Sequence, residues 1–121
     1  MSKKVLIVED NDLNRRFFND LLAAEGYETI VSPRGGDAPA LASATRPDLI
    51  LMDVRMPGED GLAATRRLKR DPETFGIPVV AVTGCALAGD EDRILDEGCD
   101  GYISKPVTVA GLLSCVEKHL R

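Results

Sequence analysis

The sequence alternates short apolar runs with longer segments in which apolar residues recur every three or four positions. This alternation is typical of βα units, because a strand buried on both faces is apolar throughout, whereas a covering helix is apolar on one side. Strands are predicted at Lys4–Val8, Glu28–Val31, Leu49–Asp53, Val79–Thr83 and Gly101–Ser104, and helices near Asp12–Glu25, Gly36–Ala44, Gly61–Arg70, Ala88–Glu97 and Val109–His119. The pattern predicts an α/β fold with a doubly wound, five-stranded parallel sheet in the order 2-1-3-4-5.

Glycines and apolar repeats refine the predicted helices. Gly26 and Gly98 stand where two helices should end, because glycine readily adopts the left-handed conformation common at helix C-termini. Apolar residues recur every four positions in the first and last helices, as Leu13, Phe17 and Leu21 and as Leu112, Val116 and Leu120. We expect both sets to face the sheet, with Phe17 as a core residue.

The length and the charge of the chain limit what it can be. Its 121 residues suit one folded domain covering residues 1–121, without an output domain. With 15 basic and 20 acidic residues the net charge is -5, so a nucleic-acid backbone would be repelled on average. Protein partners or a cation are the expected ligands.

Neither the cysteines nor the apolar runs suggest export or membrane insertion. Cys85, Cys99 and Cys115 cannot all pair, and their spacings match neither a zinc site nor a redox pair. We expect Cys85 and Cys99 to pack as small apolar groups. The longest apolar runs are far too short for a membrane helix. The sequence therefore predicts a soluble, cytoplasmic protein.

Polar residues follow or end four of the predicted strands. Glu9 and Asp10 follow the first strand, Asp53 ends the third, Thr83 ends the fourth, and Lys105 follows the fifth. Ligands bind at the carboxyl ends of parallel strands beside the point where the strand order reverses, between strands one and three. This rule brings three carboxylates together, and such a cluster suits Mg²⁺, a hard cation that prefers oxygen ligands.

These residue types support phosphoryl transfer to a carboxylate. Asp53 could attack phosphorus and form an acyl phosphate if positive charge offsets the transferring oxygens. Lys105 would supply such a charge, and the Thr83 hydroxyl could donate to a phosphoryl oxygen. Taken singly, each residue has a more ordinary reading as a helix cap, a turn residue or a solvated loop side chain. Their agreement in position favours the functional reading.

The residues that carry this chemistry resemble receiver domains of two-component response regulators along the whole chain. The matching motifs are the segments 5–11 (VLIVEDN), 51–61 (LMDVRMPGEDG), 82–84 (VTG) and 102–106 (YISKP). The resemblance implies a flavodoxin-like fold and a signalling protein rather than an enzyme. It also implies a sensor histidine kinase or a histidine phosphotransfer protein as phosphodonor, and a downstream regulatory protein as target.

The same resemblance assigns roles to individual positions. Asp53 becomes the phosphoacceptor, and the carboxylates of Asp10 and Asp53 with the backbone carbonyl of Arg55 become Mg²⁺ ligands. Glu9 would act through a water molecule. Thr83 and Tyr102 match the family's switch pair, in which the hydroxyl moves toward the phosphoryl group and the ring swings inward. Lys105 matches the site lysine, and the family fold implies a cis peptide between Lys105 and Pro106.

Three alternative functions stay open at this point. A Mg²⁺-dependent phosphatase would also place a nucleophilic aspartate at a strand end, but it should carry a second aspartate two residues later, where this chain has Arg55. A receiver that binds partners without phosphorylation should lack part of the set formed by Asp10, Asp53, Thr83 and Lys105. A flavodoxin-like binder of small molecules should have a glycine-rich or hydroxyl-rich phosphate loop after the first strand.

Overall fold

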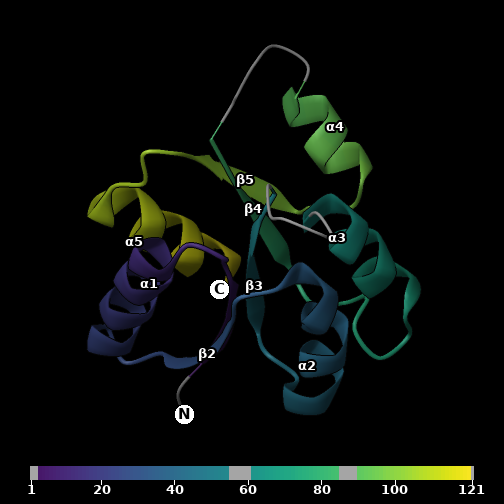
Figure 1. Ribbon diagram of the computed structural model, residues 1–121, viewed down its shortest axis with the longest axis horizontal. Helices are drawn as coiled ribbons and strands as arrows, with labels where there is room; N and C mark the ends of the chain where they lie inside the picture. The colour runs from purple at the N-terminus through teal and green to yellow at the C-terminus, as the bar shows by residue number, and fades with distance from the viewer. Residues whose placement is uncertain (1–2, 55–60, 85–89, 121) are drawn as a thin grey trace.

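The computed structural model describes residues 3–54, 61–84 and 90–120, and all structural statements below concern these residues. Within these ranges, five strands and five α-helices alternate, with one 3₁₀ turn before the second helix (Figure 1). In chain order these elements are β1 (Lys4–Val8), α1 (Asp12–Ala24), β2 (Glu28–Ser32), the 3₁₀ turn Gly35–Asp37, α2 (Ala38–Thr45), β3 (Leu49–Asp53), α3 (Gly61–Arg70), β4 (Val79–Thr83), α4 (Asp90–Asp96), β5 (Gly101–Ser104) and α5 (Val109–His119).

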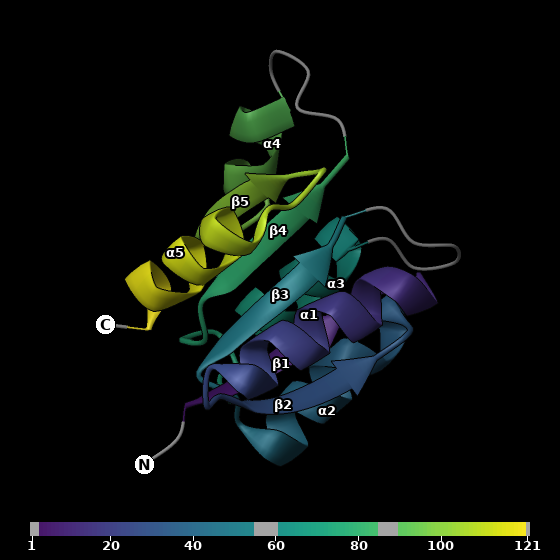
Figure 2. The same ribbon diagram turned by 90° about the vertical axis from the view of Figure 1, so that its left-hand side faces the viewer.

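The strands form one parallel sheet in the order β2-β1-β3-β4-β5, which confirms the predicted fold class. Figure 2 shows the strand arrows running in one direction across the molecule. The register pairs Val8 of β1 with Met52 of β3, and Asp53 of β3 with Val82 of β4. Residues that follow β1 therefore lie beside the end of β3, at the point where the strand order reverses.

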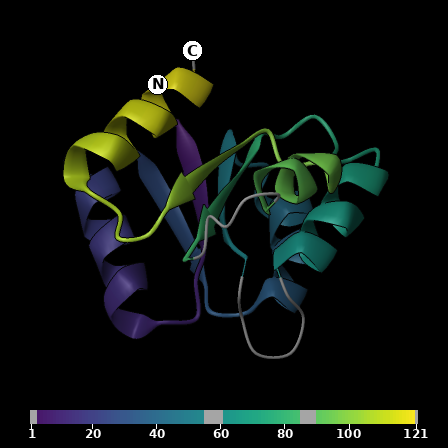
Figure 3. The same ribbon diagram turned by 90° about the horizontal axis from the view of Figure 1, so that it is seen from above.

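Two apolar layers cover the two faces of the sheet, because successive strand residues point to opposite sides. Val5 and Ile7 of β1 belong to a core cluster shared with α1 and α5, whereas Leu6 and Val8 belong to a cluster shared with α2, α3 and α4. Figure 3 shows the same division, with α1 and α5 on one side of the sheet and the other three helices opposite.

The predicted inward face of α1 is wrong for Leu13 and Phe17. Phe18 and Leu22 are buried against the sheet, whereas the Leu13 side chain is 76% exposed and that of Phe17 37%. Leu21 is partly buried and packs against the same core cluster, so the prediction holds for that residue. The helix carries two apolar stripes about 100° apart, and the four-residue repeat identified the outer one. In α5 the prediction is confirmed, because Leu112 and Val116 are buried and Leu120 packs against the same cluster.

Helix ends follow local chemistry. Gly26 and Gly98 have positive φ angles of 93° and 106°, as expected of residues that end α1 and α4. Helix α2 begins at Ala38 rather than at the predicted Gly36, since residues 35–37 form a tighter 3₁₀ turn and Pro39 suits a first helical turn. The predicted start of α4 at Ala88 lies outside the described residues.

Two of the three cysteines lie in the described part of the chain. Cys99 is buried, as expected, and Cys115 is partly buried, whereas Cys85 lies outside the described residues. Burial raises the pKa of the Cys99 thiol to about 11, so it stays protonated.

No helix in the described part of the chain has the length and apolar character needed to cross a bilayer.

Candidate metal centre

Three carboxylates converge at the carboxyl edge of the sheet, as the strand-end rule predicted. One oxygen from each of Glu9, Asp10 and Asp53 lies within 4.8 Å of the others. Glu9 and Asp10 follow β1 directly, and Asp53 is the last residue of the neighbouring β3. Their proximity therefore follows from the pairing of β1 with β3.

Glu9 and Asp53 are almost completely buried. Their side chains belong to residues only 1% and 3% exposed, while Asp10 is more open to solvent. Burial, a hydrogen bond with Asp53 and the negative charge of Asp53 together raise the pKa of Glu9 to about 8. Without a cation, one proton therefore stays with this pair near neutral pH.

The donor set fits a small hard cation. The Oε1 atom of Glu9 is buried and accepts no hydrogen bond from the described residues, although the ammonium of Lys105 lies 3.6 Å away. An unpartnered buried carboxylate oxygen is costly unless a proton or a cation compensates it. Three carboxylates with one solvent-accessible member leave room for water, which Mg²⁺ usually retains in protein sites. The Arg55 carbonyl, the other predicted ligand, lies outside the described residues.

Lys105 places a positive charge beside two of the three carboxylates. Its Nζ lies 3.5 Å from Oδ2 of Asp53 and 3.6 Å from Oε1 of Glu9. The residue follows β5, and its backbone N–H donates to the carbonyl of Thr83 at 2.7 Å. The peptide bond between Lys105 and Pro106 is cis. The site therefore combines residues from three strand ends: the two acids after β1, Asp53 at the end of β3, and Lys105 after β5.

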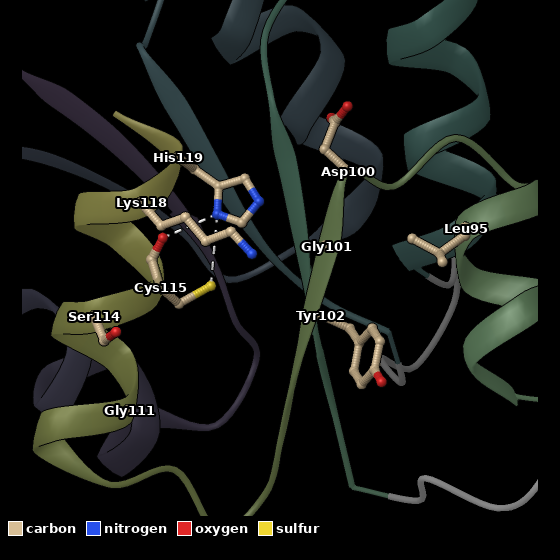
Figure 4. Close-up of a pocket in the computed structure, with 9 residues that line it drawn as sticks. All are labelled: Leu95, Asp100, Gly101, Tyr102, Gly111, Ser114, Cys115, Lys118 and His119. Atoms are coloured by element: carbon tan, nitrogen blue, oxygen red, sulfur yellow. Dashed lines mark hydrogen bonds between the residues drawn. The ribbon is translucent and has the colours of Figure 1, made fainter. Parts of the chain in front are cut away.

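Thr83 and Tyr102 lie on the two strands that follow Asp53 across the sheet. Thr83 is buried at the end of β4, one residue beyond Val82, which pairs with Asp53. Tyr102 pairs with Ala81 and packs, partly buried, against the core layer beneath α2, α3 and α4. In Figure 4 its ring extends from β5 toward α4, away from Cys115 and His119 of α5. Tyr102 is therefore not part of the carboxylate cluster itself.

Two residues beside the site have contacts that the sequence pattern did not predict. The guanidinium of Arg15 donates to the backbone carbonyls of Glu9 and Asp10, and nothing in the local pattern indicates this contact. A β-carbon on Gly61 would lie 2.1 Å from the carbonyl oxygen of Asp53. Glycine is a poor helix former, so its position at the start of a predicted helix was the available signal.

Comparison with known proteins extends these observations. The family description "Response regulator receiver domain" matches residues 5–117. The chain is 50% identical over 120 residues to the polar-differentiation response regulator DivK of Brucella anthropi, covering 99% of this chain and 98% of that protein.

Two solved structures share the fold. The receiver domain of a sensor histidine kinase from Pseudomonas aeruginosa, solved with magnesium in its active site cleft, is 32% identical with a TM-score of 0.91, covering 99% of this chain and 98% of that one. The chemotaxis protein CheY4 of Vibrio cholerae is 26% identical with a TM-score of 0.94, covering 99% of this chain and all of that one (100%).

Proposed function

Since this chain belongs to the response regulator receiver domain family, we propose that it accepts a phosphoryl group on Asp53 from a phosphohistidine donor. Asp10, Asp53 and the backbone carbonyl of Arg55 would hold Mg²⁺, with Glu9 acting through a water molecule. The observation that carries the proposal is the convergence of a buried aspartate, two further carboxylates and one lysine at the carboxyl edge of the sheet.

In the proposed transfer, a carboxylate oxygen of Asp53 bonds to phosphorus while the bond from phosphorus to the donor histidine nitrogen breaks. The nitrogen keeps that electron pair. Bound Mg²⁺ would neutralise negative charge on the transferring oxygens. Lys105, 3.5 Å from Oδ2 of Asp53, supplies a second positive charge. The Thr83 hydroxyl then donates to a phosphoryl oxygen.

The site argues against the rival functions. A covalent phosphatase would need an acid two residues after its nucleophile, and Arg55 occupies that position. Burying Glu9 and Asp53 side by side costs stability because their charges repel, and a receiver that signals without phosphorylation has no need for this arrangement. Retention of the whole set of acids and lysine therefore favours the phosphoacceptor.

A protein phosphodonor fits the surface next to the site. Leu13 and Phe17 are exposed on α1, and a hollow beside them is lined by Asn14, Phe17, Phe18, Lys105, Pro106 and Val107. Lys105 belongs both to this hollow and to the carboxylate site. An apolar partner surface seated on α1 would bring its phosphohistidine to Asp53. We propose that a histidine kinase or histidine phosphotransfer protein occupies this surface.

The output of the phosphorylated protein is proposed to be a change in protein contacts. We also place the protein in bacterial cell-cycle control, in line with its similarity to the polar-differentiation regulator DivK. The cytoplasm is the proposed compartment. Phosphorylation adds about 1.5 to 2 negative charges and strong acceptor oxygens, which can draw the Thr83 hydroxyl toward Asp53. Tyr102 on the adjacent strand would respond, and the face formed by α4, β5 and α5 would change shape for a downstream regulatory protein.

Intact-mass measurement tests the proposal. The parent protein is incubated with acetyl phosphate and Mg²⁺, and we expect a gain of one phosphoryl mass that chelation of the metal suppresses. Asp53→Asn should abolish this gain, whereas Asp96→Asn, the same change at an exposed position on α4, should retain it. A full-size gain in Asp53→Asn, or none in the parent, would refute Asp53 as the acceptor.

A further inference from the structure

We infer that Arg15 is a positioning residue for the proposed metal site, because it holds the backbone on both sides of Asp10. Arg15 is the fourth residue of α1, and its side chain is only 22% exposed. Its guanidinium faces back toward the acidic turn that follows β1 instead of extending into solvent. The inference rests on the proposed function, since it assigns Asp10 to Mg²⁺.

The contacts come from both terminal nitrogens of one side chain. Nη1 of Arg15 donates to the carbonyl oxygen of Glu9 at 3.0 Å and to that of Asp10 at 3.4 Å. Nη2 donates to the carboxylate of Asp12, so the guanidinium is itself held in place. A planar group with several fixed donors suits this arrangement better than the single ammonium of a lysine.

In the described ranges, no backbone N–H donates to the carbonyl of Glu9 or to that of Asp10. Helix α1 is capped by Asn11, whose side chain accepts from the N–H of Asn14 and whose carbonyl accepts from the N–H of Arg15 at 2.9 Å. Carbonyls before the cap lie outside the helical ladder and need another donor when they are partly buried. Arg15 supplies that donor for both.

The consequence concerns the orientation of Asp10. The Glu9 carbonyl fixes the peptide plane before the Asp10 α-carbon, and the Asp10 carbonyl fixes the plane after it. One guanidinium therefore restrains both backbone torsions of Asp10. Asp10 is the most exposed of the three carboxylates, so packing restrains its side chain less than those of Glu9 and Asp53. Its direction toward a cation depends correspondingly more on the backbone.

Charge and positioning predict opposite effects when Arg15 is replaced. Removing a positive charge beside an acidic site favours a divalent cation, so electrostatics alone predicts tighter Mg²⁺ binding. Loss of the two carbonyl contacts frees the Asp10 backbone and predicts weaker binding, as when a group that orients a metal ligand is removed. The sign of the change in Mg²⁺ affinity therefore separates the two roles.

The experiment compares Arg15→Met with Arg16→Met, its exposed neighbour on the same helix, in titrations of the protein with Mg²⁺ followed by NMR. We expect the Mg²⁺ dissociation constant of Arg15→Met to rise by about tenfold. That of Arg16→Met should stay the same or fall. Arg15→Lys keeps the charge and the aliphatic stem but not the two-carbonyl geometry, so it should also bind more weakly than the parent.

A second readout needs no metal. In EDTA, hydrogen exchange at the Asn11 amide, which donates to the Glu9 carboxylate, should be faster in Arg15→Met and Arg15→Lys than in Arg16→Met and the parent. Unchanged exchange together with unchanged or tighter Mg²⁺ binding in both Arg15 variants would overturn the inference. If the parent itself binds no Mg²⁺, the proposed function fails, while the exchange measurement still decides whether Arg15 holds this turn.

Discussion

Gly61 packs directly on the backbone of Asp53: a β-carbon at position 61 would lie 2.1 Å from the Asp53 carbonyl oxygen and 2.9 Å from its carbonyl carbon. The amide of Gly61 also donates to the carbonyl of Val54 at 3.0 Å, which ties the first residue of α3 to the end of β3. The first residue of α3 therefore packs against the backbone of the proposed acceptor, and this position has no room for a side chain.

The first prediction follows from this contact. Gly61→Ala should destabilise the fold by about 1–3 kcal/mol, because the closest clashing atoms, those of the Asp53 carbonyl, belong to backbone and cannot rotate away. It should also slow phosphorylation by acetyl phosphate, since Asp53 must shift. Gly76→Ala is the control, because no described atom would lie within 4 Å of a β-carbon at position 76. Denaturant midpoints measure the stabilities, and equal midpoints for the parent and Gly61→Ala would contradict the prediction.

The second prediction concerns pH. The pKa of Glu9 is about 8 in the folded protein against 4.5 for an ordinary glutamate, so the folded state binds more protons than the unfolded state between these values. The stability of the metal-free protein should therefore fall as pH rises from about 4.5 to 8. Melting temperatures in EDTA measure this slope. Glu9→Gln should flatten it, and an equally steep slope in that variant would assign the effect to other groups.

The third prediction concerns crowding of the acids. Without metal, Asp10 adds negative charge beside Asp53 and Glu9, so Asp10→Asn should stabilise the metal-free fold by about 0.5–2 kcal/mol. The same change should weaken Mg²⁺ binding. Asp20→Asn, on the exposed side of α1, controls for charge reduction at a distance. A lower melting temperature of Asp10→Asn in EDTA would show that Asp10 chiefly supports the fold.

The fourth prediction concerns the proposed switch. Beryllofluoride, a mimic of the acyl phosphate, should shift the ring resonances of Tyr102 in the parent with Mg²⁺, because Thr83 moves and vacates space beside β4. Thr83→Ala should lose this shift. Thr74→Ala removes another buried hydroxyl, one that donates to the Leu68 carbonyl at 2.7 Å, and should retain the response. A parent-like shift in Thr83→Ala would exclude Thr83 as the link.

The fifth prediction separates donor docking from chemistry. Leu13→Gln changes a 76% exposed side chain on α1 and should leave labelling by acetyl phosphate unchanged. Transfer from a phosphorylated histidine kinase that labels the parent should slow by about fivefold or more, because an apolar contact is lost. Phe75→Gln, at a 60% exposed residue between α3 and β4, is the control. Equal slowing with both donors would place the defect in the site itself.

The sequence alone determined the strands and the edge at which the chemistry gathers. Four strands have the predicted bounds, and β2 is one residue longer than predicted. This success has a local cause, since buried parallel strands are continuous apolar runs and the residue that ends each run is read directly. The meeting of Glu9, Asp10 and Asp53 then followed from topology, because carboxyl ends of adjacent parallel strands share one edge.

Tertiary structure decided everything that depends on how closely remote segments approach. It buried Phe18 rather than Phe17, because the sheet selects one of two apolar stripes on α1. It raised the pKa of Glu9 by burying that carboxyl next to Asp53 of the neighbouring strand. It set Gly61 against the Asp53 carbonyl and Arg15 against two carbonyls of the acidic turn. Steric fit and desolvation arise only between packed surfaces, and the periodicity of one segment contains no information about the surface it will meet.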